Sequence, residues 1–383
     1  MKKIIFKNFL SETTVFFLLS CTSVALIVWV IQAVNYLGFV TEDGHGFRVY
    51  FLYTLLSLPK IFNKLLPFMF FFSIFVMISK YEDQNQILIF WTNGIRKINF
   101  LNNLLKFSLI FLVLQLSLNL FVVPLAQDKA RSFIRQSNID FLPSLIKPKK
   151  FLDTVEKLTI YIDKKNNEDQ FQNIIIKDKY NVTDSKIIYA KEGNFQQVND
   201  ENVLILKRGK ILNINKGRTT AFDFNKTQIN LSQYSSKTTK TPKLQEVQTT
   251  LLIKCLFFLR DQRSNFISVT QDVNKFQFQC KNNKKSLDNV SQEFFKRIFK
   301  PLYLPLLTIV SCLLLIKSKN SPNYTNFKFK IFGLGILLIS ISEVSIKFFS
   351  HNLNESFFLM MLPIIFFVFL YYLFFKQSMK QPT

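Results

Sequence analysis

The sequence predicts a polytopic α-helical membrane protein with six transmembrane helices and an inserted all-β, jelly-roll-like domain outside the membrane. Its 45 Phe residues, in a chain of 383, are concentrated in six long apolar segments. Most of these segments are long enough to cross about 30 Å of hydrocarbon as helices. A polar block of roughly 125 residues with strand-like alternation separates the first three segments from the last three. The apolar segments lie near residues 15–40, 51–79, 104–125, 301–316, 329–350 and 356–375.

The first apolar stretch is too long for the core of a signal peptide and lacks a small-residue cleavage site, so we expect a retained helix. Basic residues then decide the orientation, because Lys and Arg are enriched in short cytoplasmic loops. They cluster before the first helix, after the second, between the fourth and fifth and after the sixth, as Lys2, Lys3, Lys7, Lys80, Arg96, Lys97, Lys317, Lys319, Lys328, Lys330, Lys376 and Lys380. Both termini are therefore predicted in the cytoplasm and the central domain outside it.

Between the second and third helices, the sequence predicts a short amphipathic helix over about residues 82–94. It ends at Gly94, and glycine is a common helix stop. Glu82 and Asp83 favour its N-terminus through the helix dipole. Such a helix is equally suited to lie on the membrane surface or to bind a cytosolic partner.

The central block predicts an antiparallel sandwich or jelly roll of short strands with glycine punctuation. Lys207-Arg208-Gly209-Lys210 is a good hairpin turn by composition, and residues 276–290 have the polar character of a loop. The predicted domains are 1–126 with helices one to three, 127–249 with the strands, 250–300 with a linker and an interfacial helix, and 301–383 with helices four to six.

Composition limits the chemistry. The net charge of +24 fits either an anionic partner or a bias toward Lys, Asn, Ile and Phe. With two His, no phosphate-binding Gly-Lys-Ser/Thr loop and no nucleophile elbow, we expect no catalysis, no metal, no cofactor and no nucleic acid partner. Cys255 and Cys280 lie outside the spans, where they are expected either as two independent thiols or as a disulfide pair.

Ionisable residues inside or beside the spans are the candidate ligand-binding groups, because charges are costly there. Lys60 and Lys64, one turn apart near the outer end of span two, suit an anionic headgroup or simple snorkelling to the interface. In span five, Glu343 and Lys347 have the spacing of an intrahelical ion pair. Arg48, Lys129, Arg131, Lys296 and Arg297 form a basic rim, either solvated or in contact with a ligand.

The layout and several local sequences resemble a known family. They are Tyr53-Thr-Leu-Leu-Ser-Leu-Pro-Lys60 through Leu66-Pro67, Gln86-Ile-Leu-Ile-Phe-Trp-Thr-Asn-Gly94-Ile, Val123-Pro124-Leu125-Ala126 and Leu158-Thr-Ile-Tyr-Ile162. Over essentially the whole chain, this pattern resembles the permease subunits LptF and LptG of the lipopolysaccharide export ABC transporter. Trp29-Val-Ile-Gln32 leading into Asn35-Tyr-Leu-Gly38 is more similar to LptF, whereas the Lys60 motif is similar to LptG.

The resemblance implies partners and sites. It implies a second, LptG-like or LptF-like permease subunit, a cytosolic LptB ATPase dimer, LptC with the periplasmic bridge, and lipopolysaccharide in the bacterial inner membrane. The implied headgroup-binding residues are Lys60, Lys64, Lys347, Arg48 and Arg297. The implied contacts with the ATPase are Glu82, Asp83, Gln86, Trp91 and Gly94. The family usually has Glu where this chain has Gln86, with Glu82 one turn earlier as the alternative.

Two functions follow as expectations. The first is a permease subunit that extracts lipopolysaccharide from the inner membrane and passes it to the periplasmic bridge for outer-membrane assembly. The second is a membrane-anchored scaffold or sensor that binds a protein partner and moves no lipid.

Overall fold

The computed structural model describes the chain in ranges separated by short gaps. They are residues 2–41, 46–136, 148–152, 158–165, 170–179, 184–198, 201–215, 218–230, 243–260, 266–271, 276–281, 284–349 and 353–380. The chain forms two compact units, which are described separately. A helical unit comprises Met1–Val30, Ser57–Asp128 and Pro242–Thr383, and a second unit comprises Ile31–Leu56 and Lys129–Thr241.

Six helical stretches within the described ranges are long and apolar enough to span a membrane: Lys3–Tyr36, Phe47–Asp83, Lys97–Ile134, Leu287–Ile316, Tyr324–Phe348 and Ser356–Met379. The predicted multi-pass membrane fold is thereby confirmed. Their component helices are α1 (Lys2–Tyr36), α3 (Phe47–Leu56), α4 (Leu58–Asp83), α6 (Lys97–Ser117), α7 (Val123–Gln136), α10 (Lys284–Ile298), α11 (Tyr303–Cys312), α12 (Tyr324–Phe348) and α13 (Leu353–Lys380). A short helix α2 (Gly38–Thr41) precedes α3, and a π-helical turn, Leu118–Val122, joins α6 to α7.

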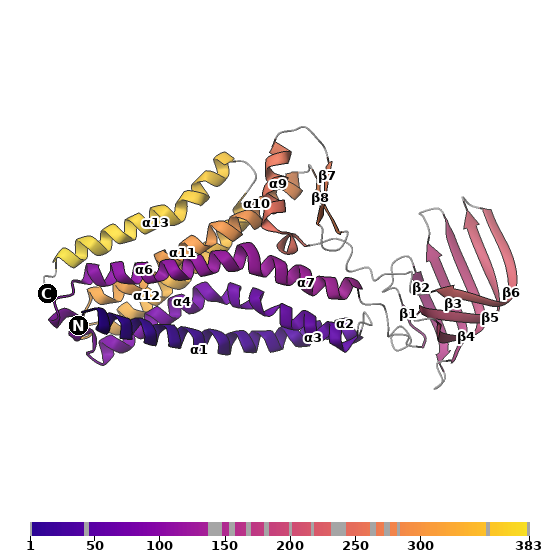
Figure 1. Ribbon diagram of the computed structural model, residues 1–383, viewed down its shortest axis with the longest axis horizontal. Coiled ribbons are helices and arrows are strands. Elements are labelled where there is room, and N and C mark those ends of the chain that lie inside the picture. Colours follow the sequence, from indigo (N-terminus) through magenta and orange to yellow (C-terminus); the bar gives the residue numbers. More distant parts are fainter. Residues whose placement is uncertain are drawn as a thin grey trace. The chain divides into compact units, whose positions relative to one another are not determined.

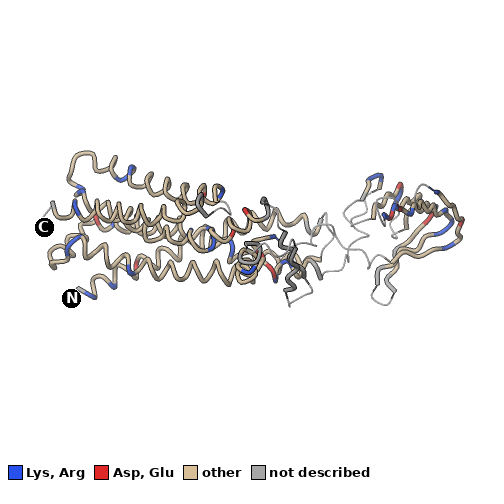
Figure 2. Tube along the Cα trace, turned by 90° about the horizontal axis from the view of Figure 1, so that it is seen from above, with Lys and Arg blue, Asp and Glu red and all other residues tan. Residues whose placement is uncertain are grey.

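Helix α11 forms the centre of the helical unit, since every one of its residues is buried. It packs against α4, α6, α12 and α13, and Figure 1 shows these helices running lengthwise beside one another, with the beginning of α1 and the end of α13 at the same end. Lipid is as apolar as a hydrophobic side chain, so close packing rather than water exclusion holds such helices together. Figure 2 accordingly shows the middle of the bundle tan, with Lys and Arg concentrated toward its two ends.

At the end of the bundle that contains Lys2 and Lys380, aromatic rings fix the turn after α4. Phe9 meets Tyr81 edge-on with ring centroids 4.9 Å apart, and Phe90 meets Phe100 at 5.1 Å. Each such contact contributes about 0.5–1.5 kcal/mol beyond its buried area. This packing holds the short helix α5 (Ile87–Thr92) through its buried side chains Ile87 and Phe90.

The predicted helix at 82–94 is shorter in the structure. Glu82 and Asp83 belong to the last turn of α4 rather than to α5. Asn85 interrupts the helical path with a positive φ of 61°, and Gly94 follows α5 with a φ of 69°. The stop at Gly94 is as predicted, because glycine adopts this left-handed conformation without a Cβ penalty.

The second unit contains a six-stranded antiparallel sheet in which each strand pairs with the next along the chain. Its strands are β1 (Phe151–Leu152), β2 (Leu158–Lys165), β3 (Gln170–Lys179), β4 (Ser185–Val198), β5 (Glu201–Asn215) and β6 (Arg218–Asn230). The inserted all-β domain is thus confirmed, and the order of its described strands is that of a meander rather than the Greek key of a jelly roll. One face packs an apolar core around Ile160, Ile176, Ile188 and Leu206.

The predicted hairpin turn at Lys207–Lys210 is wrong, because β5 continues through it from Glu201 to Asn215. Arg208 has a positive φ of 55°, and at Gly209 a Cβ would lie 2.0 Å from the Tyr189 carbonyl oxygen. Gly209 is therefore needed where two strands approach closely, and the irregularity bends the strand without ending it.

Residues 243–300 contain more structure than the sequence predicted. A 3₁₀ turn (Leu244–Glu246) leads into α9 (Thr249–Arg260), and β7 (Phe266–Gln271) pairs with β8 (Phe276–Lys281). Strand β8 lies in the segment 276–290, where a loop was expected. Cys255 is disulfide-bonded, which contradicts the interpretation of Cys255 as an independent thiol. The side chain of Cys280 lies outside the described residues.

Candidate functional site: a basic chamber among the helices

A chamber of about 380 Å³ lies among helices of the helical unit. Helices α4, α6, α7, α10 and α12 contribute to its wall, together with the turns before α9 and before α11. Six of its side chains are basic and two are acidic. The lining residues are Lys60, Asn63, Lys64, Gln115, Asn119, Val123, Pro124, Gln245, Glu293, Lys296, Arg297, Lys300, Glu343, Ile346 and Lys347. Four of the predicted headgroup residues, the lysines Lys60, Lys64 and Lys347 together with Arg297, thus line one chamber.

These three lysines differ from the other cations of the chamber. Among the described residues, the ammonium groups of Lys60, Lys64 and Lys347 make no hydrogen bond and no ion pair. Lys60 is half-buried, whereas Lys64 and Lys347 are exposed. Three cationic groups without an internal counter-ion are suited to an external anion.

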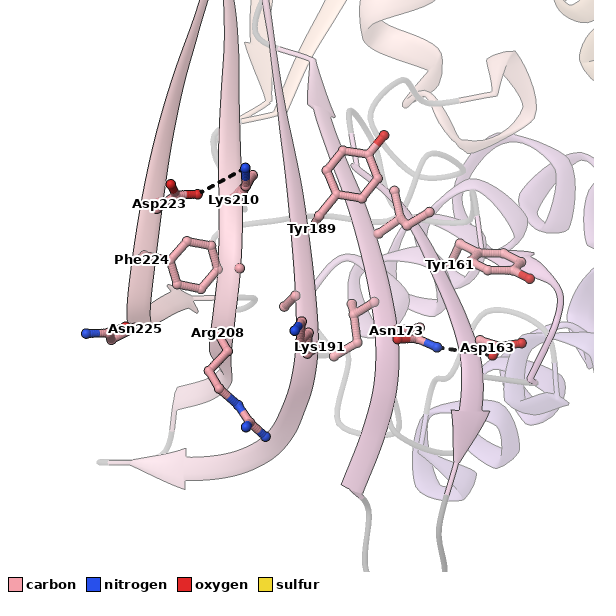
Figure 3. Close-up of a pocket in the computed structure, with 14 residues that line it drawn as sticks. Tyr161, Asp163, Asn173, Tyr189, Lys191, Arg208, Lys210, Asp223, Phe224 and Asn225 are labelled. Atoms are coloured by element: carbon pink, nitrogen blue, oxygen red, sulfur yellow. Dashed lines mark hydrogen bonds and ion pairs between the residues drawn. The ribbon is translucent and has the colours of Figure 1, made fainter.

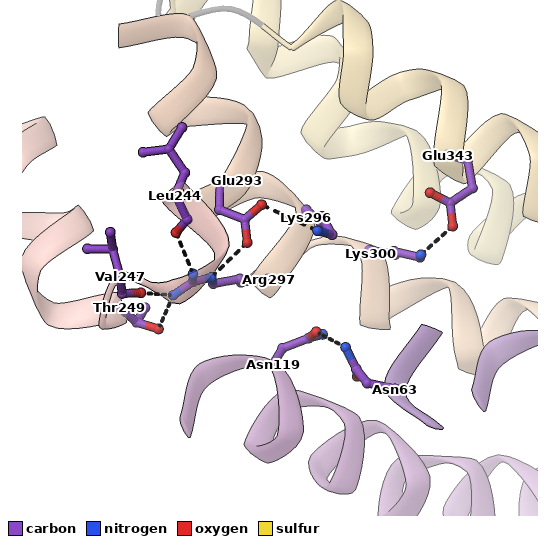
Figure 4. Close-up of polar contacts among 10 residues, drawn as sticks. All are labelled: Asn63, Asn119, Leu244, Val247, Thr249, Glu293, Lys296, Arg297, Lys300 and Glu343. Atoms are coloured by element: carbon purple, nitrogen blue, oxygen red, sulfur yellow. Dashed lines mark hydrogen bonds and ion pairs between the residues drawn. The ribbon is translucent and has the colours of Figure 1, made fainter. Parts of the chain in front are cut away.

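Arg297 also lines the chamber, but its guanidinium is engaged by the protein. It donates from Nη1 to the Val247 carbonyl at 2.9 Å and to Thr249 Oγ1 at 2.8 Å. It also donates from Nη2 to the Leu244 carbonyl at 3.1 Å and from Nε to Glu293 Oε1 at 3.2 Å. Figure 4 shows this fan of contacts. Buried to 2% exposure, Arg297 ties α10 to the start of α9.

The remaining two cations are paired with the two acids. Lys296 Nζ lies 3.3 Å from Glu293 Oε2, and the buried Lys300 forms an ion pair with Glu343 of α12 (Figure 4). The spacing of Glu343 and Lys347 predicted an intrahelical pair, and the structure instead joins Glu343 of α12 to Lys300 in the 3₁₀ turn before α11. Lys347 is left to face the chamber for this reason.

Arg48 is not among the residues that line the chamber. It is exposed on α3, in the unit that contains the sheet. The rim residue Lys129 is likewise exposed and Arg131 is buried in that unit. The chamber therefore does not unite all the residues proposed from the sequence.

The chamber wall contains an amide group that sequence reasoning missed. Asn63 of α4 donates to Asn119 Oδ1 at 2.6 Å (Figure 4), and Asn119 lies in the π-helical turn. The Leu120 carbonyl in the same turn accepts a hydrogen bond from Thr249 Oγ1 at 2.8 Å. π-Helical turns occur often at functional sites, and this one brings a polar side chain into the chamber.

Lys300 and Glu293 were also missed as site residues. Both are ordinary residues of a polar stretch before the fourth span, and their role depends on which helices pack together. One sequence signal was available, because Asn63, Gln115 and Asn119 are polar residues within otherwise apolar spans.

At the opposite ends of α4 and α12, the residues predicted to contact an ATPase make contacts within the chain. Asp83 lies 2.9 Å from Lys328 Nζ through both carboxylate oxygens. Glu82 Oε1 accepts from the backbone N–H of Lys319 at 3.1 Å. These contacts fasten the end of α4 to the beginning of α12.

Helix α5 itself leaves an apolar face exposed. Leu88 and Ile89 are 52% and 48% exposed. Gln86 and Trp91 are half-buried, and the Trp91 ring packs on Phe100 with centroids 6.0 Å apart. The surface that α5 offers to a partner therefore consists mainly of Leu88 and Ile89.

The sheet has an open groove of about 660 Å³ on its own surface. Figure 3 shows Tyr161 on β2 and Tyr189 on β4, the strands on either side of β3, with the pair of Lys210 and Asp223 on β5 and β6. These residues belong to one cross-strand row through Ile175, as the pairing register shows. Charges of both signs occur around it, so the groove is amphipathic rather than strongly basic.

Six helices long and apolar enough to span a membrane and an inserted β domain define the class: a multi-pass membrane protein, here with a basic chamber among its helices. A model of the family described as "Lipopolysaccharide export system permease LptF/LptG" matches residues 7–377. The chain therefore belongs to the LptF/LptG family of lipopolysaccharide export permeases. Members of this family are permease components of an ABC transporter.

The chain is also similar to Uncharacterized protein RP871 of Rickettsia prowazekii (strain Madrid E), with 23% identity over 235 residues. The matched region covers 61% of this chain and 65% of that relative. The chain thus spans less than two thirds of this relative's length.

Proposed function

We propose that this chain is a permease subunit that extracts lipopolysaccharide from the inner membrane and passes it to a periplasmic bridge for outer-membrane assembly. The observation that best supports this function is the chamber with the unpaired Lys60, Lys64 and Lys347. Phosphate groups are strong acceptors for ammonium donors, and a charged hydrogen bond contributes about 1.5–3 kcal/mol. The three lysines would hold the phosphates of the lipid, while Arg297 shapes the wall.

The depth of the chamber supports a headgroup site. From Lys60 to Asp83, α4 advances 23 residues, which is about 34 Å at 1.5 Å per residue. The two ends of α4 are therefore about a hydrocarbon thickness apart. We place the chamber at the outer, periplasmic face and Asp83 at the cytoplasmic face, with both termini in the cytoplasm and the sheet in the periplasm, because the short loops rich in Lys and Arg belong inside.

The partners follow from this arrangement as proposals. An LptB-like ATPase dimer would bind the exposed Leu88 and Ile89 of α5, with Gln86, Trp91 and Gly94 shaping that surface. A second permease subunit would pack against spans such as α1, whose apolar side chains are largely exposed. The sheet would pass the lipid on to an LptC-like protein and the bridge. The family match covers both subunits, and the assignment to LptF stays a prediction.

The test is photocrosslinking of lipopolysaccharide to the chain in its own membrane. In the triple variant Lys60→Gln, Lys64→Gln, Lys347→Gln, we expect crosslinking from a probe in the chamber wall to fall at least about tenfold, since three charged contacts are lost. The matched control is Lys106→Gln, Lys254→Gln, Lys330→Gln, three exposed lysines that do not line the chamber. Undiminished crosslinking in the first variant would overturn the headgroup role.

The proteins that co-purify with the chain distinguish the permease function from the scaffold function. A permease should co-purify with a stoichiometric cytosolic ATPase and a second six-span subunit. Isolation alone, or as a homodimer, would support a scaffold or sensor that moves no lipid.

A further inference from the structure

Two carboxamide oxygens in the chamber have no hydrogen-bond donor within the part of the chain that the structure describes. Gln115 of α6 is 1% exposed, and its Oε1 has no hydrogen-bond partner among the described residues. Asn63 Oδ1 is buried in the same way and also lacks a partner there. Both residues line the chamber beside the unpaired lysines. A buried acceptor without a hydrogen bond costs about 1–3 kcal/mol. A ligand that donates a hydrogen bond to either oxygen would therefore bind more tightly.

The Asn63–Asn119 pair leads to the same conclusion whichever amide donates. One carboxamide accepts through its oxygen, and the oxygen of the other then remains without a donor. The lysines of the chamber do not donate to either oxygen in the structure. Both oxygens are therefore placed to accept a hydrogen bond from a molecule in the chamber.

The chemistry of that donor excludes the phosphate itself. A fully ionised phosphate has only acceptor oxygens, which suit Lys60, Lys64 and Lys347 but leave Gln115 Oε1 and Asn63 Oδ1 unsatisfied. A hydroxyl or an amide N–H satisfies a carboxamide oxygen directly. A sugar that bears phosphates has such groups within a few bonds of its anionic oxygens, whereas a simple phosphodiester without hydroxyls has none.

We propose that Gln115 and Asn63 recognise hydroxyl donors of a phosphorylated saccharide lipid while the lysines hold its phosphates. This inference rests on the proposed function and deepens it, because it identifies the residues that distinguish a hydroxyl-bearing saccharide headgroup from anionic lipids without hydroxyl donors. Sites built to hydrogen-bond a substrate hydroxyl reject an analogue that lacks it strongly, because the buried protein groups are then left unpaired.

The experiment compares two lipids of equal charge. Membrane nanodiscs containing the chain with its co-purified partners are titrated with a bisphosphorylated glucosamine disaccharide lipid and with its O-methylated analogue. Methylation removes hydroxyl donors and keeps both phosphates. The wild type should bind the unmodified lipid about tenfold more tightly, as expected for one or two buried hydrogen bonds.

In Gln115→Leu and Gln115→Met, which remove the strong acceptor with little change in volume, the affinity ratio should fall about threefold or more. Binding of the methylated lipid should change little. A steric effect of the methyl groups would persist in these variants, so the comparison isolates the hydrogen bond. Ser108→Ala is the control, because Ser108 is also buried on α6 but does not line the chamber.

The outcomes are distinguishable. Equal binding of the two lipids by the wild type, or an unchanged ratio in both Gln115 variants, would overturn this inference and leave phosphate binding intact. Failure of the wild type to bind either lipid would instead overturn the proposed function. The triple lysine variant should lose affinity for both lipids by similar factors.

Discussion

Arg297 shows that the neighbours of a side chain decide its role. Its sequence position suggested a headgroup contact, but the guanidinium donates to Val247, Thr249, Leu244 and Glu293 in a buried position. Lysine cannot reproduce this geometry, because its ammonium is a point donor rather than a planar fork. The residue therefore holds the α9–α10 junction beside the chamber.

Arg297→Lys should lower the free energy of unfolding by about 2–4 kcal/mol, since buried carbonyl acceptors lose their donors. Thermal unfolding of the detergent-solubilised protein measures this change. Lys296→Gln is the control on the same helix turn, with a side chain 40% exposed, and should change stability by at most about 1 kcal/mol. If Arg297→Lys kept full stability but lost lipid crosslinking, Arg297 would be a ligand contact.

At the scale of elements, the contact of α4 with α12 depends on a glycine at the point where the two helices meet. A Cβ on Gly335 of α12 would lie 2.0 Å from the ring of Phe71 on α4. Phe71 is fully buried and stacks on Phe332 with centroids 5.9 Å apart, so its ring cannot swing away. Small residues permit this close approach of membrane helices.

Gly335→Ala should destabilise the protein by about 1–3 kcal/mol through overpacking. The chain offers a matched control two residues away, because a Cβ on Gly333 meets nothing within 4 Å. Gly333→Ala should be neutral or slightly stabilising, as alanine favours a helix over glycine. Differential scanning fluorimetry in detergent distinguishes the two variants. Equal shifts for both would show that the α4–α12 contact is looser than described.

At the scale of the whole helical unit, α12 runs from the contact with the end of α4 to the chamber. Lys328 near its beginning pairs with Asp83, and Lys347 near its end lines the chamber. These positions are 19 residues apart, or about 28 Å along the helix. Movement of α5 and the end of α4 in the proposed ATPase cycle would thus reach the lipid site through one rigid element.

Reversing either charge, in Asp83→Lys or Lys328→Asp, should reduce lipid-stimulated ATP turnover of the assembled complex up to about fivefold. The pair is partly exposed, and such pairs contribute at most about 1 kcal/mol. The double reversal should restore turnover, which is measured in nanodiscs. If the double variant stayed as impaired as the single ones, the pair would not be the connection. Lys330→Asp is a control with an exposed lysine on the same helix.

The sequence predicted some features of the two units correctly and missed others. Span length and hydropathy located the six helices, and alternation located the sheet. The prediction of a hairpin turn at Lys207–Lys210 was wrong. A positive φ, as at Arg208, and a close approach of two strands, as at Gly209, also occur inside a strand. The residue pattern also could not show that Glu82 and Asp83 end α4 rather than begin α5.

The sequence by itself determined the class of this protein, six membrane spans with an inserted strand-rich domain, because hydropathy and alternation are local properties of the chain. Only the tertiary structure decided which charges remain available. Lys300 pairs with Glu343, so Lys347 has no ion pair among the described residues. Arg297 donates to Thr249 of α9, and Gln115 lines the chamber together with lysines from other helices. Such pairings depend on which side chains come into contact between helices that are far apart in sequence, and hydropathy contains no information about those contacts.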